Sequence, residues 1–221
     1  MMSSRPFVRL LSWDVKAVFA VAAVVALAVL LWPRKLVWVD SALTGKAYRV
    51  KPLPDRQAAA DRLAEMELRL RAFMDAAEAV VPGDVRLQNV RRRWNGTLAE
   101  TPGGDDIAYS IGKDSVYVCV RDADGRIDDL NTSMFVLVHE LGHVATDDWG
   151  HPPVFWQNMK FLLELAERTG LYVYQDFDSG KVTYCGRRLG GSPLTCIKNG
   201  KCGSELAAPS VASAPTTPTR W

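Results

Sequence analysis

The sequence lacks a strong charge of either sign. Its 27 lysines and arginines nearly balance 25 aspartates and glutamates, so the formal net charge is only +2 and the pI is near 8.3. Nucleic-acid-binding domains carry a basic patch or stripe, whereas the cations here are spread along the chain. The short run Arg91, Arg92 and Arg93 is interpreted as a solvated loop or strand edge. We therefore expect no nucleic-acid partner.

Cysteine is also scarce. The chain has four cysteines, and no two of them have the C-x-x-C spacing of a structural zinc knuckle. Cys119 stands alone in a strand-like run, while Cys185, Cys196 and Cys202 lie near the end. One disulfide among these last three and free thiols are both open alternatives. No internal repeat is visible, so 221 residues suggest one globular domain with appendages.

Only one long apolar run is present. The segment Ala17–Trp32 contains no charged or polar side chain. In a helix, Trp13 and Trp32 would lie about 28 Å apart, close to the thickness of the hydrocarbon core of a bilayer. No small-x-small cleavage site follows the run, which favours an uncleaved single-pass membrane anchor at residues 13–33 over a signal peptide or a buried soluble helix.

The side of the membrane is less clearly indicated. Positive charges flank the apolar run on both sides, and the comparison leans weakly towards a cytosolic C-terminal domain. Two tripeptides, beginning at Asn95 and Asn131, have the pattern for N-glycosylation and would allow it in a lumenal domain.

The pattern along the chain predicts an α+β fold. The expected segments are a tail at 1–12, the anchor at 13–33, a linker at 34–55, a domain at 56–203 and a disordered tail at 204–221. Within the domain, apolar residues at helical spacing predict a helix over 56–80. Residues 84–94 have the pattern of a strand, and residues 106–121 that of a hairpin turning at Gly112. A small antiparallel or mixed sheet would pack on the helices.

All three histidines fall within "HELGHVATDDWGH", residues 139–151. Asn131 suits an N-cap, which predicts a helix over 132–145. Pro153 suits the first turn of a second helix, and Gly170 suits its end.

The spacing of the first two histidines suits a metal site. His139 and His143 are four residues apart, so their imidazoles lie on one helix face and can converge on a zinc ion. Glu140 is turned about 100° around the helix from His139, where it can act as a general base without ligating. His151, at the junction between two helices, is the expected third ligand.

Two carboxylates are alternatives for the third ligand. Asp147 lies one turn after His143, and we expect it rather to accept a hydrogen bond from a ligating histidine. Glu164 lies 21 residues after His143, near the spacing of glutamate-completed zinc proteases. The sequence favours His151 over both.

"HELGH" followed by "GHPPVFW" resembles the zincin metallopeptidases, and among them the WLM and SprT-like group. The stretch from Tyr117 to Cys185 is also similar to predicted metallopeptidases of large DNA viruses and some algae, so a viral protein is implied. The resemblance covers the middle third of the chain and implies a zincin-like fold, with His139, His143 and His151 on Zn²⁺ and Glu140 as base. Seven residues separate the last two histidines, against five in WLM proteins, so no DNA-repair role is carried over.

The resemblance implies a membrane-anchored zinc endopeptidase that acts on a protein or peptide substrate. The strand at 115–120 is expected to be the edge strand that pairs with the substrate. Tyr172, Tyr174 or Tyr184 is a candidate donor to the oxyanion. The rival interpretations are a membrane-tethered binding or scaffold protein with a non-catalytic zincin-like domain, and a zinc hydrolase of non-peptide amides.

Overall fold

The structure, a computed structural model, describes residues 17–24, 36–103, 107–179 and 181–195. The chain divides into two units, and we call the second, Lys35–Trp221, the C-terminal unit.

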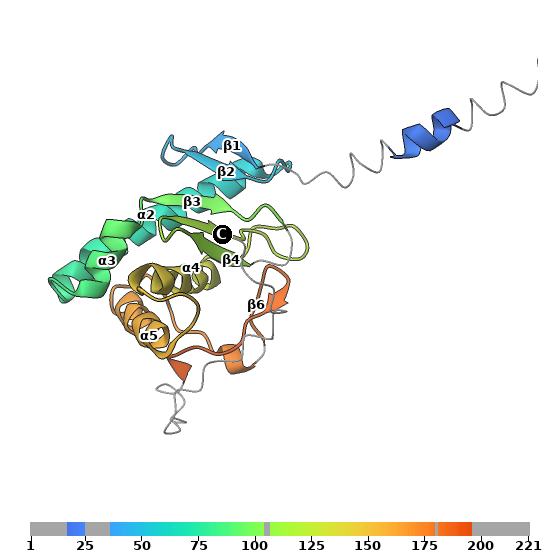
Figure 1. The fold of residues 1–221 in the computed structure, drawn as a ribbon. Helices are drawn as coiled ribbons and strands as arrows, with labels where there is room; N and C mark the ends of the chain where they lie inside the picture. Colours follow the sequence, from blue (N-terminus) through green and yellow to red (C-terminus); the bar gives the residue numbers. More distant parts are fainter. Residues whose placement is uncertain (1–16, 25–35, 104–106, 180, 196–221) are drawn as a thin grey trace, which may run out of the picture. The chain divides into compact units, whose positions relative to one another are not determined.

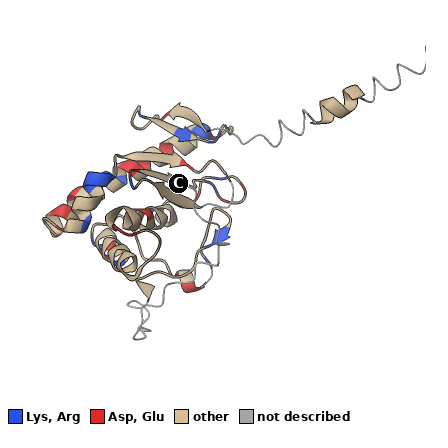
Figure 2. Cartoon of the chain, viewed as in Figure 1, with Lys and Arg blue, Asp and Glu red and all other residues tan. Residues whose placement is uncertain are grey.

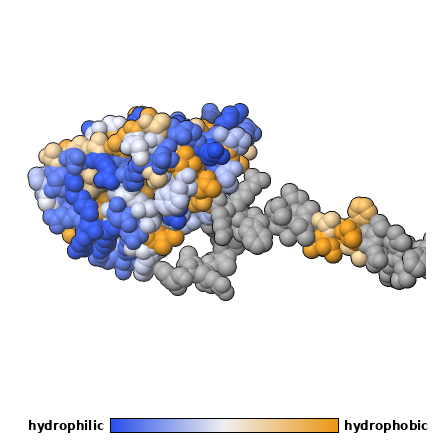
Figure 3. All heavy atoms as spheres, turned by 90° about the horizontal axis from the view of Figure 1, so that it is seen from above, coloured by the Kyte–Doolittle hydropathy of each residue, from blue (hydrophilic) through white to orange (hydrophobic). Residues whose placement is uncertain are grey.

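The first unit is described only at residues 17–24. They form a helical stretch with exposed apolar side chains (Figure 3). Among the described residues, no helix has both the length and the apolar character needed to span a bilayer. Most of the expected anchor at 13–33 and all of the expected tail at 204–221 lie outside the described residues.

The C-terminal unit is built on a five-stranded mixed sheet (Figure 1). Its strands are β1 (Val37–Asp40), β2 (Ala47–Val50), β3 (Thr97–Glu100), β4 (Ala108–Ile111) and β5 (Ser115–Val118). Their spatial order is β1-β2-β3-β5-β4, in which β3 pairs in parallel with both β2 and β5, and the outer pairs are antiparallel. The mixed sheet and the β4–β5 hairpin agree with the sequence-based expectation.

Two expectations about the sheet are wrong. The predicted linker at 34–55 contains β1 and β2, whose residues Tyr48 and Val50 are fully buried in the core. The predicted edge strand at 115–120 is interior, because β5 lies between β3 and β4 and leaves β4 outermost. The sequence pattern of β4 resembles that of β5, so it cannot show which of the two strands pairs with β3. That choice depends on pairing between segments that are distant in the sequence.

Four long helices are described in the C-terminal unit: α2 (Arg56–Val80), α3 (Val85–Arg93), α4 (Leu130–Ala145) and α5 (Pro153–Arg168). The helix predicted at 56–80 is confirmed as α2, whereas the strand predicted at 84–94 is helix α3. Asp84 caps α3 by accepting a hydrogen bond from the Arg86 backbone N–H, and Leu87 and Val90, three residues apart, are both buried. Basic residues gather at the C-terminal end of α3 (Figure 2), where they complement the helix dipole.

One face of the sheet carries the core. The Tyr48 hydroxyl donates to Glu67 of α2, and Val116 and Val118 of β5 are buried on the same face. Helix α2 packs beneath β1, β2 and β3, and α4 packs beneath β4 and β5, with α5 against the far side of α4 (Figure 1). Twelve of the sixteen residues of α4 are buried, so this helix is enclosed by the sheet on one side and by α3 and α5 on others.

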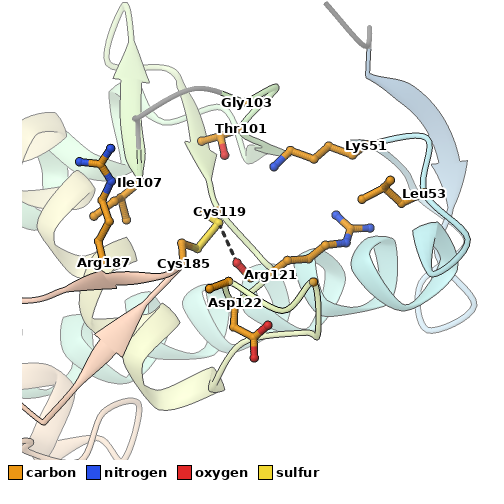
Figure 4. Close-up of a pocket in the computed structure, with 12 residues that line it drawn as sticks. Lys51, Leu53, Thr101, Gly103, Ile107, Cys119, Arg121, Asp122, Cys185 and Arg187 are labelled. Atoms are coloured by element: carbon orange, nitrogen blue, oxygen red, sulfur yellow. Dashed lines mark hydrogen bonds between the residues drawn. A yellow bond between two sulfur atoms is a disulfide. The ribbon is translucent and has the colours of Figure 1, made fainter. Parts of the chain in front are cut away.

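A disulfide joins Cys119, just after β5, to Cys185 in the short hairpin of β6 (Thr183–Tyr184) and β7 (Arg187–Arg188). This pairing corrects the expectation of a disulfide among the last three cysteines or of free thiols; Cys196 and Cys202 lie outside the described residues. The bond forms part of the wall of a cavity of about 260 Å³ (Figure 4). The guanidinium of Arg121 in that wall is already paired with Asp55 and Glu100.

Removing the disulfide should lower the free energy of unfolding. The bond closes a loop with a sequence separation of 66, for which the chain-entropy estimate is about 4 kcal/mol. We expect the double variant Cys119→Ala, Cys185→Ala to lose about this much in urea unfolding. Wild type measured under reducing conditions should match the double variant. Equal stability of the oxidised wild type and the double variant would contradict the assignment.

Candidate metal centre

Helix α4 carries the first two histidines. It runs over Leu130–Ala145, so its C-terminal end is as predicted, but its N-cap is Asp129, whose side chain accepts a hydrogen bond from the Thr132 backbone N–H. The expected cap, Asn131, lies inside the first turn and bonds the backbone N–H and C=O of Val173 instead. Aspartate and asparagine cap helices about equally well, so propensity alone could not choose between them.

The three histidines converge at the end of α4. One nitrogen from each of His139, His143 and His151 can be chosen so that all three atoms lie within 4.8 Å of one another. The Nε2 atoms of His139 and His151 are 3.1 Å apart. A tetrahedral zinc ion bound at 2.0–2.1 Å would hold two ligand nitrogens about 3.3–3.4 Å apart. The cluster therefore has the spacing needed to hold a metal ion.

Aromatic side chains of α5 pack against all three rings. The ring of Phe155 has its centroid 4.9 Å from that of His139, 4.3 Å from that of His143 and 4.6 Å from that of His151. Trp156 stacks on His151 at 5.4 Å with an interplanar angle of 25°. Phe155 is fully buried and Trp156 nearly so, and α5 begins at Pro153 as predicted. These two side chains limit the rotation of the imidazoles.

The imidazoles are held in their neutral form. Burial lowers the pKa of His139 well below its ordinary value, and the neighbouring His143 and His151 add to the effect. Burial, the His151 ring and the Lys113 ammonium lower the pKa of His143 to about 4. Burial also lowers the pKa of His151. Three neutral rings near pH 7 offer the lone pairs that metal ligation needs.

Glu140, which follows His139 on α4, is buried. It is 4% exposed, and burial raises its pKa to about 8 despite a hydrogen bond with Ser110 of β4, which acts in the opposite direction. Among the described residues, no group donates a hydrogen bond to its Oε2 atom. A buried carboxylate oxygen without a partner is costly in a folded protein and indicates a place for a ligand or a reacting group.

The alternative ligands lie away from the cluster. The Asp147 side chain is exposed and pairs with Arg93. The expectation that it accepts a hydrogen bond from a histidine of the cluster is therefore wrong. Glu164 pairs with Lys160 on the surface of α5 and is not part of the cluster.

The three tyrosines proposed as oxyanion donors make their described hydrogen bonds away from the cluster. The Tyr172 hydroxyl accepts a hydrogen bond from the Gln175 backbone, and the Tyr184 hydroxyl donates to the Cys119 carbonyl. The Tyr174 hydroxyl bonds Thr195. The described hydrogen bonds thus give none of them a role at the cluster.

Two cations hold the segment that presents His151. The sequence pattern assigned Lys113 no role at the site, and it placed Arg93 in a solvated loop or strand edge, whereas Arg93 lies in the last turn of α3 and bonds this segment. We call residues 146–152 the histidine loop. Lys113, in the β4–β5 turn, donates to the carbonyls of Thr146 and Asp147, the latter at 2.6 Å. Arg93, at the end of α3, donates to the carbonyl of Thr146 at 3.2 Å and pairs with the Asp147 carboxylate. The Lys113 Nζ atom also lies 4.9 Å from the ring centroid of Trp149.

Gly142, inside "HELGH", permits the close approach of α5. A Cβ atom built on Gly142 would lie 3.0 Å from Cε2 of Phe155 and 3.4 Å from Cβ of Met159. We expect Gly142→Ala to destabilise the fold by about 1 kcal/mol, because an overpacking cost of about 1–3 kcal/mol exceeds the gain of about 1 kcal/mol in helix propensity. Chemical unfolding would measure the change, and Phe155→Leu in the same chain should reduce it. An increase in stability would refute this packing.

The comparisons with known proteins identify viral relatives. The chain is 27% identical over 157 residues to uncharacterized protein R325 of Acanthamoeba polyphaga mimivirus, an alignment that covers 67% of this chain and 80% of the relative. It is 35% identical over 68 residues to uncharacterized protein 136R of Invertebrate iridescent virus 6 and 39% identical over 69 residues to uncharacterized protein 042R of Invertebrate iridescent virus 3. These two alignments cover 38% and 43% of the relatives. No family model and no solved structure matches the chain.

Proposed function

We propose that this chain is a zinc-dependent metallopeptidase that hydrolyses peptide bonds in protein substrates. One observation carries the proposal: three neutral imidazoles converge at metal-binding distances, and Glu140, the residue after His139, has a buried carboxyl group with an unbonded oxygen. Neutral imidazoles are preferred ligands of zinc, and catalytic zinc sites take three protein ligands. The resemblance of "HELGH" to the zincin motif supports the same reaction.

Each residue then has a role at the reacting bond. His139, His143 and His151 would hold the zinc ion, which supplies Lewis acidity at the scissile carbonyl. Glu140 takes a proton from the attacking water and delivers it to the leaving amine. Burial raises the pKa of Glu140 to about 8, so near pH 7 the group is mostly protonated; a cation held by the three histidines would favour its charged form, which could then accept the proton.

The proposed substrate site lies along β4. Among the described strands, β4 is outermost in its part of the sheet, so its outer edge can pair with an extended peptide through main-chain hydrogen bonds. Ser110 of β4 bonds Glu140 of α4, so a peptide added to β4 would pass close to the proposed base. The geometry thus suits an extended peptide substrate, and β4 takes the role that the sequence assigned to residues 115–120.

Zinc content and Glu140-dependent cleavage test the proposal. We expect one zinc per purified chain by elemental analysis, and His151→Ala should lose it or bind it more weakly. Glu140→Gln should keep the zinc but cleave casein about 10²–10⁴-fold more slowly than wild type, because only the proton transfer is removed.

The outcomes separate the rival functions. If His151→Ala binds as much zinc as wild type and as tightly, the three-histidine site is wrong. A zinc-loaded chain without Glu140-dependent cleavage of any protein would favour the non-catalytic binding or scaffold interpretation, or a non-peptide substrate.

The cations on the histidine loop provide a further test. The double variant Arg93→Ala, Lys113→Ala should lower zinc affinity about ten-fold or more, because residues that orient a ligand typically contribute this much. Arg92→Ala is the matched control, since Arg92 is exposed, hydrogen-bonds only Asn89 among the described residues and acts on the loop only through its charge near Asp147. Competition with a chromophoric chelator measures the affinity, and circular dichroism checks the fold. Equal affinities of the double variant and the control would show that the loop holds His151 without these cations.

A further inference from the structure

The Cys119–Cys185 disulfide indicates the kind of cellular compartment in which the chain folds. The bond links the end of β5 to a hairpin near the C-terminal end of the described chain, and the Cys185 backbone N–H donates to Asp128 at 2.7 Å. Cys119 is only 7% exposed and Cys185 is half-buried against the core, so the bond joins the hairpin to the packed C-terminal unit. Disulfides of this structural kind form in oxidising compartments and are rare in the cytosol.

The structure distinguishes the two glycosylation tripeptides. Asn131 lies in the first turn of α4, where its amide nitrogen donates to the Val173 carbonyl and its amide oxygen accepts from the Val173 backbone N–H, both at 2.8 Å. A glycan on that nitrogen would displace the segment that holds Val173. The Asn131 side chain therefore serves the fold.

Asn95 has a different environment. It is exposed in the loop between α3 and β3, and its amide oxygen accepts a hydrogen bond from the Thr97 backbone N–H at 2.8 Å. Among the described residues, no hydrogen bond uses its amide nitrogen, which is the atom that glycosylation modifies. Thr97, the third residue of the tripeptide, is half-buried at the start of β3.

We infer that the C-terminal unit lies on the oxidising side of a membrane and that Asn95 carries an N-linked oligosaccharide. In the transfer, the Asn95 amide nitrogen loses one proton and bonds C1 of the first sugar, while the sugar's bond to a polyprenyl pyrophosphate breaks and the pyrophosphate leaves. In disulfide formation, the two thiols give two protons and two electrons to an oxidoreductase disulfide. This placement is opposite to the cytosolic side that the positive charges around the apolar run favoured. It does not depend on the proposed peptidase activity.

Expression of the full chain in a eukaryotic cell tests both parts. We expect wild type to migrate more slowly than the chain treated with peptide:N-glycosidase, and mass spectrometry without reduction to find the Cys119–Cys185 peptide pair. Thr97→Ala should abolish the glycan and Thr97→Ser should keep it, since serine preserves the tripeptide. Asn131→Gln should leave the glycan unchanged, and the retained disulfide reports that each variant has folded.

Each other outcome overturns a defined part of the inference. A glycan lost in Asn131→Gln but kept in Thr97→Ala would refute the site. A disulfide without any glycan would refute the modification, and free thiols at Cys119 and Cys185 in an unglycosylated chain would place the unit on the reducing side. Casein cleavage and zinc content need not change in any of these cases, so failure here is distinguishable from failure of the proposed function.

Discussion

The candidate centre depends on the contact between α4 and α5. At Gly142 the absence of a side chain lets the Phe155 ring approach the helix backbone, and the same ring contacts all three imidazoles. A larger residue at 142 would move α5 outward, and α5 positions both the aromatic wall and the end of the histidine loop. The glycine of "HELGH" is therefore a packing requirement as much as a part of a motif.

The sequence predicts the parts of the molecule whose determinants are local. Helical spacing gives α2, α4 and α5, and a glycine turn between alternating apolar residues gives the β4–β5 hairpin. The grouping of His139, His143 and His151 also follows from local features, namely i,i+4 spacing and a proline that starts the next helix. Zinc, peptide hydrolysis and the membrane anchor stay proposals.

The features that the sequence did not predict depend mainly on contacts between residues that are distant in the sequence. Only residues 85–88 alternate apolar and polar as in a strand, and Leu87 and Val90, three residues apart, are buried on one helix face. Pairing of Cys119 with Cys185 and the position of β5 inside the sheet are settled by tertiary packing. Lys113 and Arg93 could not be assigned to the histidine loop, because their partners there are backbone carbonyls, which have no sequence signature, and the Asp147 carboxylate, 54 residues from Arg93.

The histidine loop has a consequence for the order in which the site is assembled. Arg93 and Lys113 reach the loop from α3 and from the β4–β5 turn, across sequence separations of 53 and 33 residues to Thr146. His139 and His143 come together as soon as α4 forms, but His151 is fixed only when α3 and the hairpin have docked on that helix. One helix thus brings two of the imidazoles together, whereas the third is placed by tertiary contacts. The candidate centre is complete only once the tertiary structure has formed, so a partly unfolded chain would lack its third imidazole.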